Sequence, residues 1–274
     1  MMTAVTARPG RAAGTRRELP LLIGHQFHAD LRCFTRNTQS VFFTLLMPVL
    51  FLVILASIFR NATATVPGGT IKESVYYVPG LIAYGVIMAA FSNLALSVVR
   101  NREAGIYKRR RATPLPASAV IAARAAVAVL TALAITVVML GIGWAAYGAS
   151  IPGRTAPAFV LDVIVGAVVF CCLGFAAASL IGTVDAVQPV IWVTVLPLCF
   201  ISGIFIPVSV LPAWLAYISY VFPVHPLAAA LLVAYNPYTT GSGLTWGYLA
   251  ILAAWGVAGL IVAVRRFSWL PRGG

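Results

Sequence analysis

The longest apolar stretch of the chain, residues 119–147, reads AVIAARAAVAVLTALAITVVMLGIGWAAY and holds one charged residue, Arg124, near its start. A helix that crosses about 30 Å of hydrocarbon needs roughly 20 mostly apolar residues. This stretch is therefore long enough to span a bilayer as a single helix. Five similar stretches flank it, and the set predicts an all-α, polytopic membrane protein with six transmembrane helices. The expected spans are residues 41–59, 78–99, 119–147, 158–181, 189–205 and 245–264.

The composition of the chain agrees with a bilayer environment. Hydrophobic residues make up 61% of its 274 residues and charged residues only 9%. Soluble domains carry about a quarter charged residues, so a water-soluble core could not hide this much apolar surface. Arginine far outnumbers lysine and alanine is abundant, which is typical of high-GC bacterial genomes. We therefore expect a multi-pass protein of a bacterial cytoplasmic membrane.

The basic residues predict how the chain is oriented. Sixteen of the nineteen lysines and arginines fall on one side of the six-span arrangement, and the other side keeps Arg60, Lys72 and Arg154. Cytosolic loops of membrane proteins carry such an excess of positive charge, so both termini are expected in the cytosol. The net charge of +13 is concentrated between apolar runs. That distribution, without a nucleic-acid-reading motif, argues against a nucleic-acid partner.

Residues 206–235 are apolar enough to be mistaken for a seventh span. Prolines interrupt the stretch, however, and a seventh span would move the arginine-rich C-terminus to the other side. We therefore predict an extracellular re-entrant helical hairpin, which requires packing against protein or a watery cavity. The residues singled out in and beside this hairpin are Gly203, Pro207, Pro212, Trp214, Pro223, His225 and Pro226.

The sequence predicts three structural units along the chain. Residues 1–18 show little periodicity and are expected to form a disordered cytosolic arm. Residues 19–40 are expected to form an amphipathic helix, which either lies along the inner membrane surface or packs on the protein's own cytosolic face. Residues 41–274 form the transmembrane domain. The apolar residues at helical spacing in the second unit are Ile23, Phe27, Leu31 and Phe34.

Catalytic and metal-binding patterns are missing from the sequence. The only lysines, Lys72 and Lys108, do not follow a glycine-rich phosphate loop, so the chain lacks the pattern that cradles ATP phosphates. His25 and His28 stand three residues apart without an evident third ligand. The four cysteines form no CxxC motif or disulfide framework. We expect no catalytic residue, no metal and no cofactor bound by this chain.

The most informative segment is the basic stretch 100–116, RNREAGIYKRRRATPLP. Arginines that only enforce topology and contact lipid headgroups would explain its charge. They would not explain the apolar pair Ile106 and Tyr107, or the stop formed by Pro114 and Pro116. A short helix that presents the apolar pair to a partner, with charge around it, explains both features. We therefore predict a protein-docking segment.

Several stretches of the chain form a longer signature: YVPGL at 77–81, Arg102-Glu103 with Gly105, KRRRATPL at 108–115, SGIFIP at 202–207, LPAW at 211–214, FPVHPL at 222–227, and the approach to the first span at 36–48. This signature resembles that of ABC-2-type permeases, the membrane subunits of ABC transporters. The resemblance covers nearly the whole chain after residue 20. It departs from the family at Ile106, where a threonine is frequent, and we expect no fused ATPase domain.

The resemblance implies an ABC exporter of the drug-resistance type. Two copies of a separate ATPase subunit would bind ATP and Mg, and a second permease, identical or similar, would complete the transporter. The cargo would be an amphiphilic drug, natural product or lipid-like molecule. Asp185, in the cytosolic loop 183–188, is a second expected contact or a simple polar turn. The coupling helix that docks on the ATPase would comprise Glu103, Gly105, Ile106, Tyr107, Lys108, Arg109, Arg110 and Arg111.

Two residues are candidates for the translocation path. Asp162 is a carboxylate within a span, near its outer end, and it is either functional or simply paired or solvated. Trp192 either contacts an apolar substrate or marks the membrane interface. Alternative functions are a secondary transporter or channel that needs no ATPase, and an ABC-2 exporter of lipid-linked polysaccharide. A membrane-embedded enzyme would need a catalytic constellation that the sequence lacks.

Overall fold

The computed structural model describes residues 15–36, 38–106 and 117–266, and it confirms the all-α class. Two short strands are the exception to the helical architecture. The elements are α1 Thr15–Arg36, α2 Thr38–Ile58, β1 Thr63–Val66, β2 Gly69–Lys72, α3 Glu73–Ile87, the π-helical turn Met88–Ser92, α4 Asn93–Glu103, α6 Ala117–Tyr147, α7 Ala156–Leu180, α8 Val184–Ile201, the 3-10 turn Val208–Val210, α9 Ala213–Val221, α10 Val224–Tyr235 and α11 Trp246–Arg266.

Five helical stretches of the described chain are long and apolar enough to cross a membrane. The helix α2 adds a shorter apolar stretch, Thr44–Ile58. A protein with this many apolar helices is a multi-pass membrane protein, as the sequence predicts. The five stretches are Glu73–Glu103, Ile121–Tyr147, Ala156–Leu180, Val184–Ile201 and Trp246–Arg266.

The helix boundaries differ from the expected ones where polar residues extend a helix beyond the apolar run. The expected span 78–99 lies inside Glu73–Glu103, in which α3, the π-helical turn and α4 follow one another without a break. At 1.5 Å per residue this unit is roughly 46 Å long, which exceeds the hydrocarbon thickness. Its ends therefore extend beyond the bilayer core and can carry functional side chains there.

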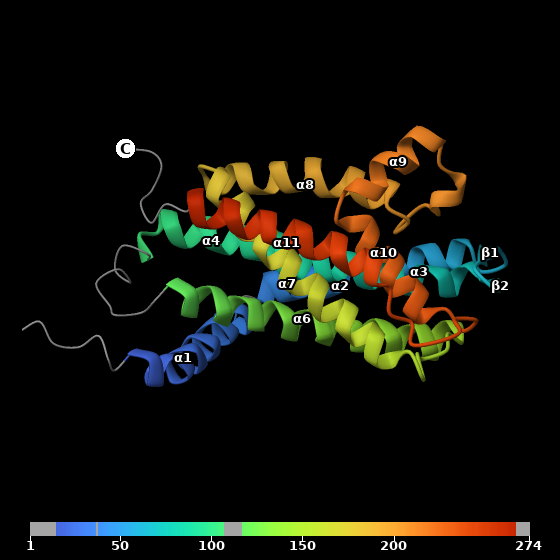
Figure 1. Ribbon diagram of the computed structural model, residues 1–274, viewed down its shortest axis with the longest axis horizontal. Helices are drawn as coiled ribbons and strands as arrows, with labels where there is room; N and C mark the ends of the chain where they lie inside the picture. The colour runs from blue at the N-terminus through green and yellow to red at the C-terminus, as the bar shows by residue number, and fades with distance from the viewer. Residues whose placement is uncertain (1–14, 37, 107–116, 267–274) are drawn as a thin grey trace, which may run out of the picture.

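The helix α7 lies at the centre of the bundle, in contact with α3, α6, α10, α11 and the π-helical turn (Figure 1). Its closest partner is α11, which approaches through glycines. A Cβ on Gly256 would lie 3.1 Å from Val169 Cγ2, and one on Gly259 would lie 3.1 Å from the backbone nitrogen of Leu173. Small residues allow such close helix packing in membranes, where dispersion contacts replace the hydrophobic effect.

The elongated bundle has two distinct ends (Figure 1). We call the left end in Figure 1 the basic end, because α1 begins there and α4 and α11 end there with Arg100, Arg102, Arg265 and Arg266. We call the right end the hairpin end, because β1, β2 and α9 lie there. The sequence predicted one strongly basic end and one end with few basic residues, because sixteen of the nineteen lysines and arginines fall on one side of the expected spans.

A β-hairpin at the hairpin end was not predicted from the sequence. The antiparallel strands β1 and β2 turn at Gly68, whose φ of 94° favours glycine. The connection between α10 and α11 holds this turn. There, Asn236 Nδ2 donates to the Pro67 carbonyl at 2.9 Å, and Tyr238 Oη donates to the Thr70 carbonyl at 3.2 Å. The hairpin is thereby fixed to the end of α10.

The stretch expected to be re-entrant forms two helices that meet at an angle of 92°. The axis changes direction at Phe222 and Pro223, between α9 and α10. Proline lacks a backbone N–H and has a fixed φ, so it starts a new helix readily but does not continue an old one. The bent pair is consistent with either a broken span or a re-entrant loop by its length and composition.

The helix boundaries at the N-terminal side also differ from the expected units. The helix α1 begins at Thr15, inside the arm that was expected to be disordered, and residues 1–14 lie outside the described part. It ends at Arg36, and α2 begins at Thr38. The expected unit 19–40 therefore contains most of α1 and the first residues of α2. The helix α1 packs against α6, so it contacts the protein's own surface.

Candidate functional site

Arg102, in the last turn of α4, is buried at the basic end with 2% of its surface exposed. Its guanidinium donates to the carbonyl of Ala178 at 3.0 Å, to that of Gly182 at 2.9 Å, and to that of Ile181. These carbonyls lie at the C-terminus of α7, where a helix leaves its last acceptors without internal partners. A cation is also favourable beside the negative end of a helix dipole. Arg102 therefore caps α7.

Glu103, the next residue, contacts the beginning of α8. Its Oε1 accepts a hydrogen bond of 2.8 Å from the backbone N–H of Val184, the first residue of α8. A carboxylate stabilises a helix N-terminus because it accepts from free N–H groups and faces the positive end of the dipole. We call Arg102 and Glu103 the Arg–Glu clamp. Together they join the end of α4 to the connection between α7 and α8.

The clamp brings two expected ATPase contacts into one place. Glu103 lies at the start of the expected coupling segment, and Asp185 is an exposed residue in the first turn of α8, next to Val184. Gly105 has a φ of 65° and ends the helical run, and the side chain of Ile106 is exposed. The other expected contacts lie outside the described residues: Tyr107, Lys108, Arg109, Arg110 and Arg111.

A second polar contact at the basic end ties α1 to the bundle. Arg124 of α6 lies 3.7 Å from Asp30 of α1 and donates to Ser97 Oγ of α4. Both charged side chains are about nine-tenths buried, so solvent screens this ion pair less than it would screen an exposed one. The position of α1 is therefore linked to α4, the helix that carries the clamp.

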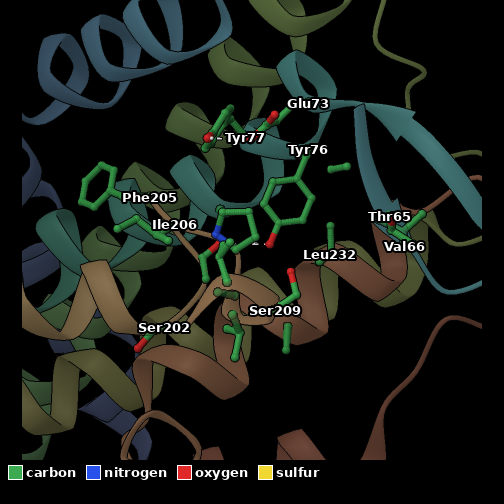
Figure 2. Close-up of a pocket in the computed structure, with 18 of the residues that line it drawn as sticks. Thr65, Val66, Glu73, Tyr76, Tyr77, Ser202, Phe205, Ile206, Ser209 and Leu232 are labelled. Carbon is green, nitrogen blue, oxygen red and sulfur yellow. Dashed lines mark hydrogen bonds between the residues drawn. The ribbon is translucent and has the colours of Figure 1, made fainter. Parts of the chain in front are cut away.

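A cavity of about 630 Å³ opens at the hairpin end, between α3 and the segment 202–210 that follows α8. Figure 2 shows Glu73, Tyr76 and Tyr77 of α3 along its upper side, with Ser202 and Ser209 opposite them. Strand β1 and helix α10 supply further walls. Most of the lining is apolar or aromatic, with a few polar groups, as in pockets that bind small molecules.

Two sequence motifs of the predicted family signature meet at this cavity. A Cβ on Gly80, from YVPGL, would lie only 3.2 Å from the backbone of Ile204, from SGIFIP. Tyr76 Oη also donates to the Gly203 carbonyl at 3.5 Å. The two motifs are more than 120 residues apart in the chain, yet their backbones pack directly. The glycine at residue 80 is needed for this approach.

The residues expected in the re-entrant hairpin occupy distinct positions. Pro207 lines the cavity, Pro212 immediately precedes α9, and Trp214 is exposed on α9. Pro223 precedes α10, whose first turn contains His225 and Pro226, both buried. His225 Nδ1 lies 3.3 Å from the Ser202 carbonyl. That bond ties α10 to the segment that leaves α8.

The two candidate path residues do not share an environment. Asp162 of α7 is fully buried, and neither of its carboxylate oxygens has a hydrogen-bond partner among the described residues. Trp192 is exposed on α8. In the described part of the chain, no group of three or more His, Cys, Asp or Glu residues is placed to hold a metal ion.

Comparison with known proteins identifies the family. The family model described as "ABC-2 type transporter" matches residues 25–236. This chain belongs to the ABC-2 type transporter family. The match includes the Arg–Glu clamp, the motifs that meet at Gly80, and the bent helix pair. It confirms the family that the sequence motifs indicated.

Two curated proteins are similar to this ABC-2 chain over part of its length. Both are named "Probable multidrug ABC transporter permease YbhR", one from Escherichia coli strain K12 and the other from Escherichia coli O157:H7. Each is 28% identical over 149 residues, which cover 54% of this chain and 40% of the relative. The aligned region thus spans less than half of each relative. The family assignment therefore rests on the family model, and the two relatives agree with it over the aligned residues.

The sequence motifs located these positions only in part. The dipeptide at 102 and 103 was part of the family signature, and Glu103 was assigned to the ATPase interface. Arg102 received no role, because a capping arginine is identified only by the carbonyls that it reaches. The contact between Asp30 and Arg124 was also missed. Opposite charges on two distant helices carry no local sequence signal.

Proposed function

We propose that this protein is the permease subunit of an ATP-driven exporter in a bacterial cytoplasmic membrane. Its basic end would face the cytosol, because positive charge is retained on that side. A separate ATPase subunit would bind ATP and Mg. Membership of the ABC-2 family supports this assignment. The strong division of basic residues between the two ends supports the orientation.

The Arg–Glu clamp carries the proposal for coupling. Docking of the ATPase on segment 103–111 would move the end of α4. Because Arg102 holds the end of α7 and Glu103 holds the start of α8, both helices would move with it. Asp185 would contact the same ATPase from the first turn of α8. A single docking event would therefore reach α4, α7 and α8 together.

The proposed cargo is an amphiphilic drug, natural product or lipid-like molecule. The mostly apolar cavity at the hairpin end supports this substrate class, and the curated relatives are named as multidrug permeases. The complete transporter would contain two ATPase subunits and a second permease, either a copy of this chain or a similar one. The exposed apolar helix faces would contact lipid or that second permease.

Docking is tested by co-purification with the ATPase. The variant Tyr107→Ala combined with Arg109→Glu removes one aromatic contact and reverses one charge in the coupling segment. We expect it to reduce ATPase recovery by at least about tenfold, because truncating an interface hot spot costs about 2 kcal/mol or more, which is roughly thirtyfold in affinity. The measurement is the ratio of ATPase to permease after affinity purification from detergent.

A matched control places the same kinds of change at the hairpin end. Trp214→Ala combined with Arg154→Glu alters an exposed aromatic residue and an exposed arginine there. This control should retain the wild-type ratio of ATPase to permease. Equal recovery in the docking variant and the wild type, with both permeases monodisperse, would contradict the coupling assignment.

A secondary transporter is the second candidate function. The fully buried Asp162, without a hydrogen-bond partner among the described residues, favours it. Carboxylates inside membrane spans often bind protons or ions during transport. A secondary transporter would move substrate without any ATPase, and Asp162→Asn would abolish that movement. In an ATP-driven exporter, transport would depend on the ATPase in both the wild type and this variant.

A further inference from the structure

The cavity at the hairpin end contains an acidic group that lacks an opposite charge. Glu73 is the only acidic residue among the described residues that line it. Its Oε1 accepts a hydrogen bond of 3.1 Å from Tyr77 Oη, and it forms no ion pair within the described part of the chain. The protein as a whole carries a net charge of +13. A carboxylate in a largely apolar wall is costly unless a cation or hydrogen-bond donors compensate it.

His225 and Ser202 also belong to the lining. His225 is 7% exposed, and its Nδ1 lies 3.3 Å from the Ser202 carbonyl, which fixes the position of the ring. The Nε2 of that ring and the hydroxyl oxygen of Ser202 are buried, so neither atom is presented to the cavity. The charge of the lining therefore comes from Glu73.

Aromatic rings complete the cation-binding character of the cavity. Tyr76 and Tyr77 both line it, and their ring centroids lie 5.9 Å apart in an edge-to-face arrangement. The face of a tyrosine ring attracts a cation at a distance of up to about 6 Å. Glu73 lies on the same helix, one turn away from both rings. Tyr77 is only 1% exposed, so it acts by donating its hydrogen bond to Glu73. A cationic group in the cavity would therefore meet the Glu73 carboxylate and the ring of Tyr76.

We propose that this cavity binds an amphiphile through a cationic group held by Glu73 and Tyr76, with Tyr77 positioning the Glu73 carboxylate. Its apolar body would pack against Phe205, Val208 and Leu232 on the remaining walls. The volume of about 630 Å³ lies in the range typical of drug-sized ligands. The proposal rests on the proposed function, since it specifies the charge of the exporter's substrate and a site for it within a single permease.

The test uses two probes of nearly equal size and opposite charge. Tetraphenylphosphonium is a permanent cation, and tetraphenylborate is an anion of the same shape. Saturable binding of each is measured on the full-length permease in phosphatidylcholine nanodiscs, with empty nanodiscs subtracted. We expect the cation to bind at least about tenfold more tightly than the anion, because a carboxylate in a largely apolar lining attracts one and repels the other.

Three variants locate the binding site. Glu73→Gln removes the charge but keeps an oxygen that accepts from Tyr77, and it should weaken cation binding by roughly tenfold. Ala229→Trp fills the cavity and should abolish cation binding while Glu73 stays intact. Arg154→Gln changes an exposed charge at the same end, outside the lining, and should bind the cation as the wild type does.

The outcomes separate this proposal from the proposed function. Absence of saturable cation binding to the wild type, equal binding of the two probes, or unchanged cation binding by Glu73→Gln would overturn the cation site. None of these results depends on an ATPase. The ATPase co-purification ratio of Glu73→Gln should equal that of the wild type, because the cavity lies at the opposite end from the clamp. A failure of docking alone would leave the cation site supported.

Discussion

Replacing Arg102 by methionine should lower the stability of the permease by at least about 3 kcal/mol and uncouple ATP hydrolysis from transport. Methionine fills much of the same space but donates no hydrogen bond. Three carbonyls at the end of α7 would then lose their shared donor, and each unsatisfied buried acceptor costs about 1–3 kcal/mol. The end of α7 would no longer follow α4. Thermal unfolding in detergent and substrate-stimulated ATP hydrolysis in proteoliposomes measure the two effects.

Two further variants separate loss of coupling from simple misfolding. Arg102→Lys retains the positive charge, but a single ammonium group cannot reach all three carbonyls as the planar guanidinium does. This variant should therefore recover only part of the stability and part of the substrate-stimulated ATP hydrolysis. Arg100→Ala removes an exposed arginine from the same turn and should behave as the wild type. Wild-type stability and stimulation in Arg102→Met would show that the capping contact is dispensable.

Replacing Gly174 by alanine should cost about 1–3 kcal/mol of stability, because overpacked side chains force backbone shifts. A Cβ at this position of α7 would lie 3.0 Å from the Phe91 carbonyl oxygen and 3.1 Å from that of Ala90. Both belong to the π-helical turn between α3 and α4, whose backbone cannot move as a side-chain tip can. The thermal midpoint of the purified permease should therefore fall.

The same change at Gly141 is the matched control. This residue lies in the span α6, and a Cβ there would meet nothing within 4 Å in the described structure. Alanine is better than glycine in a helix interior by about 0.5–1 kcal/mol, so Gly141→Ala should hold or raise the midpoint. Equal midpoints for the two alanine variants would contradict the close packing of α7 on the π-helical turn.

Fold class was predictable from the sequence because membrane spans have a strong local signal. A run of about 20 apolar residues is stable only as a helix inside a bilayer or deep in a protein core. The stretch 119–147 accordingly falls within one helix, α6. The boundaries were less predictable, because α3 begins at Glu73 and α4 ends at Glu103, both polar. Helices continue into the interface, where charge is tolerated.

The β-hairpin at 63–72 had a sequence signal that went unused. Apolar Ala64 and Val66 alternate with Thr63 and Thr65, and the turn residues Pro67 and Gly68 follow them. The stretch is short, and two strands alone are marginally stable. Its stability comes from Asn236 and Tyr238, about 170 residues away along the chain. Such long-range support cannot be read from local pattern.

The candidate sites depend on contacts between distant segments in the same way. The motifs at 77–81 and 202–207 were recognised separately, but nothing in either one showed that Gly80 packs on Ile204. The basic segment at 100–116 was identified by its charge and its prolines. Its link to α8 through Glu103 and Val184 became visible only once the backbone N–H of Val184 was located. A local sequence pattern identifies a single helix or strand, whereas a contact between two distant segments is identified only from the structure.

The most direct test of the central claim is transport by the reconstituted permease, with and without its ATPase. Proteoliposomes are given a panel of fluorescent amphiphiles covering cationic, neutral and anionic charge. We predict uptake that requires ATP, Mg and both subunits, and that is lost when the ATPase cannot hydrolyse ATP. Uptake by the permease alone, driven by an ion gradient and unaffected by ATP, would contradict the account.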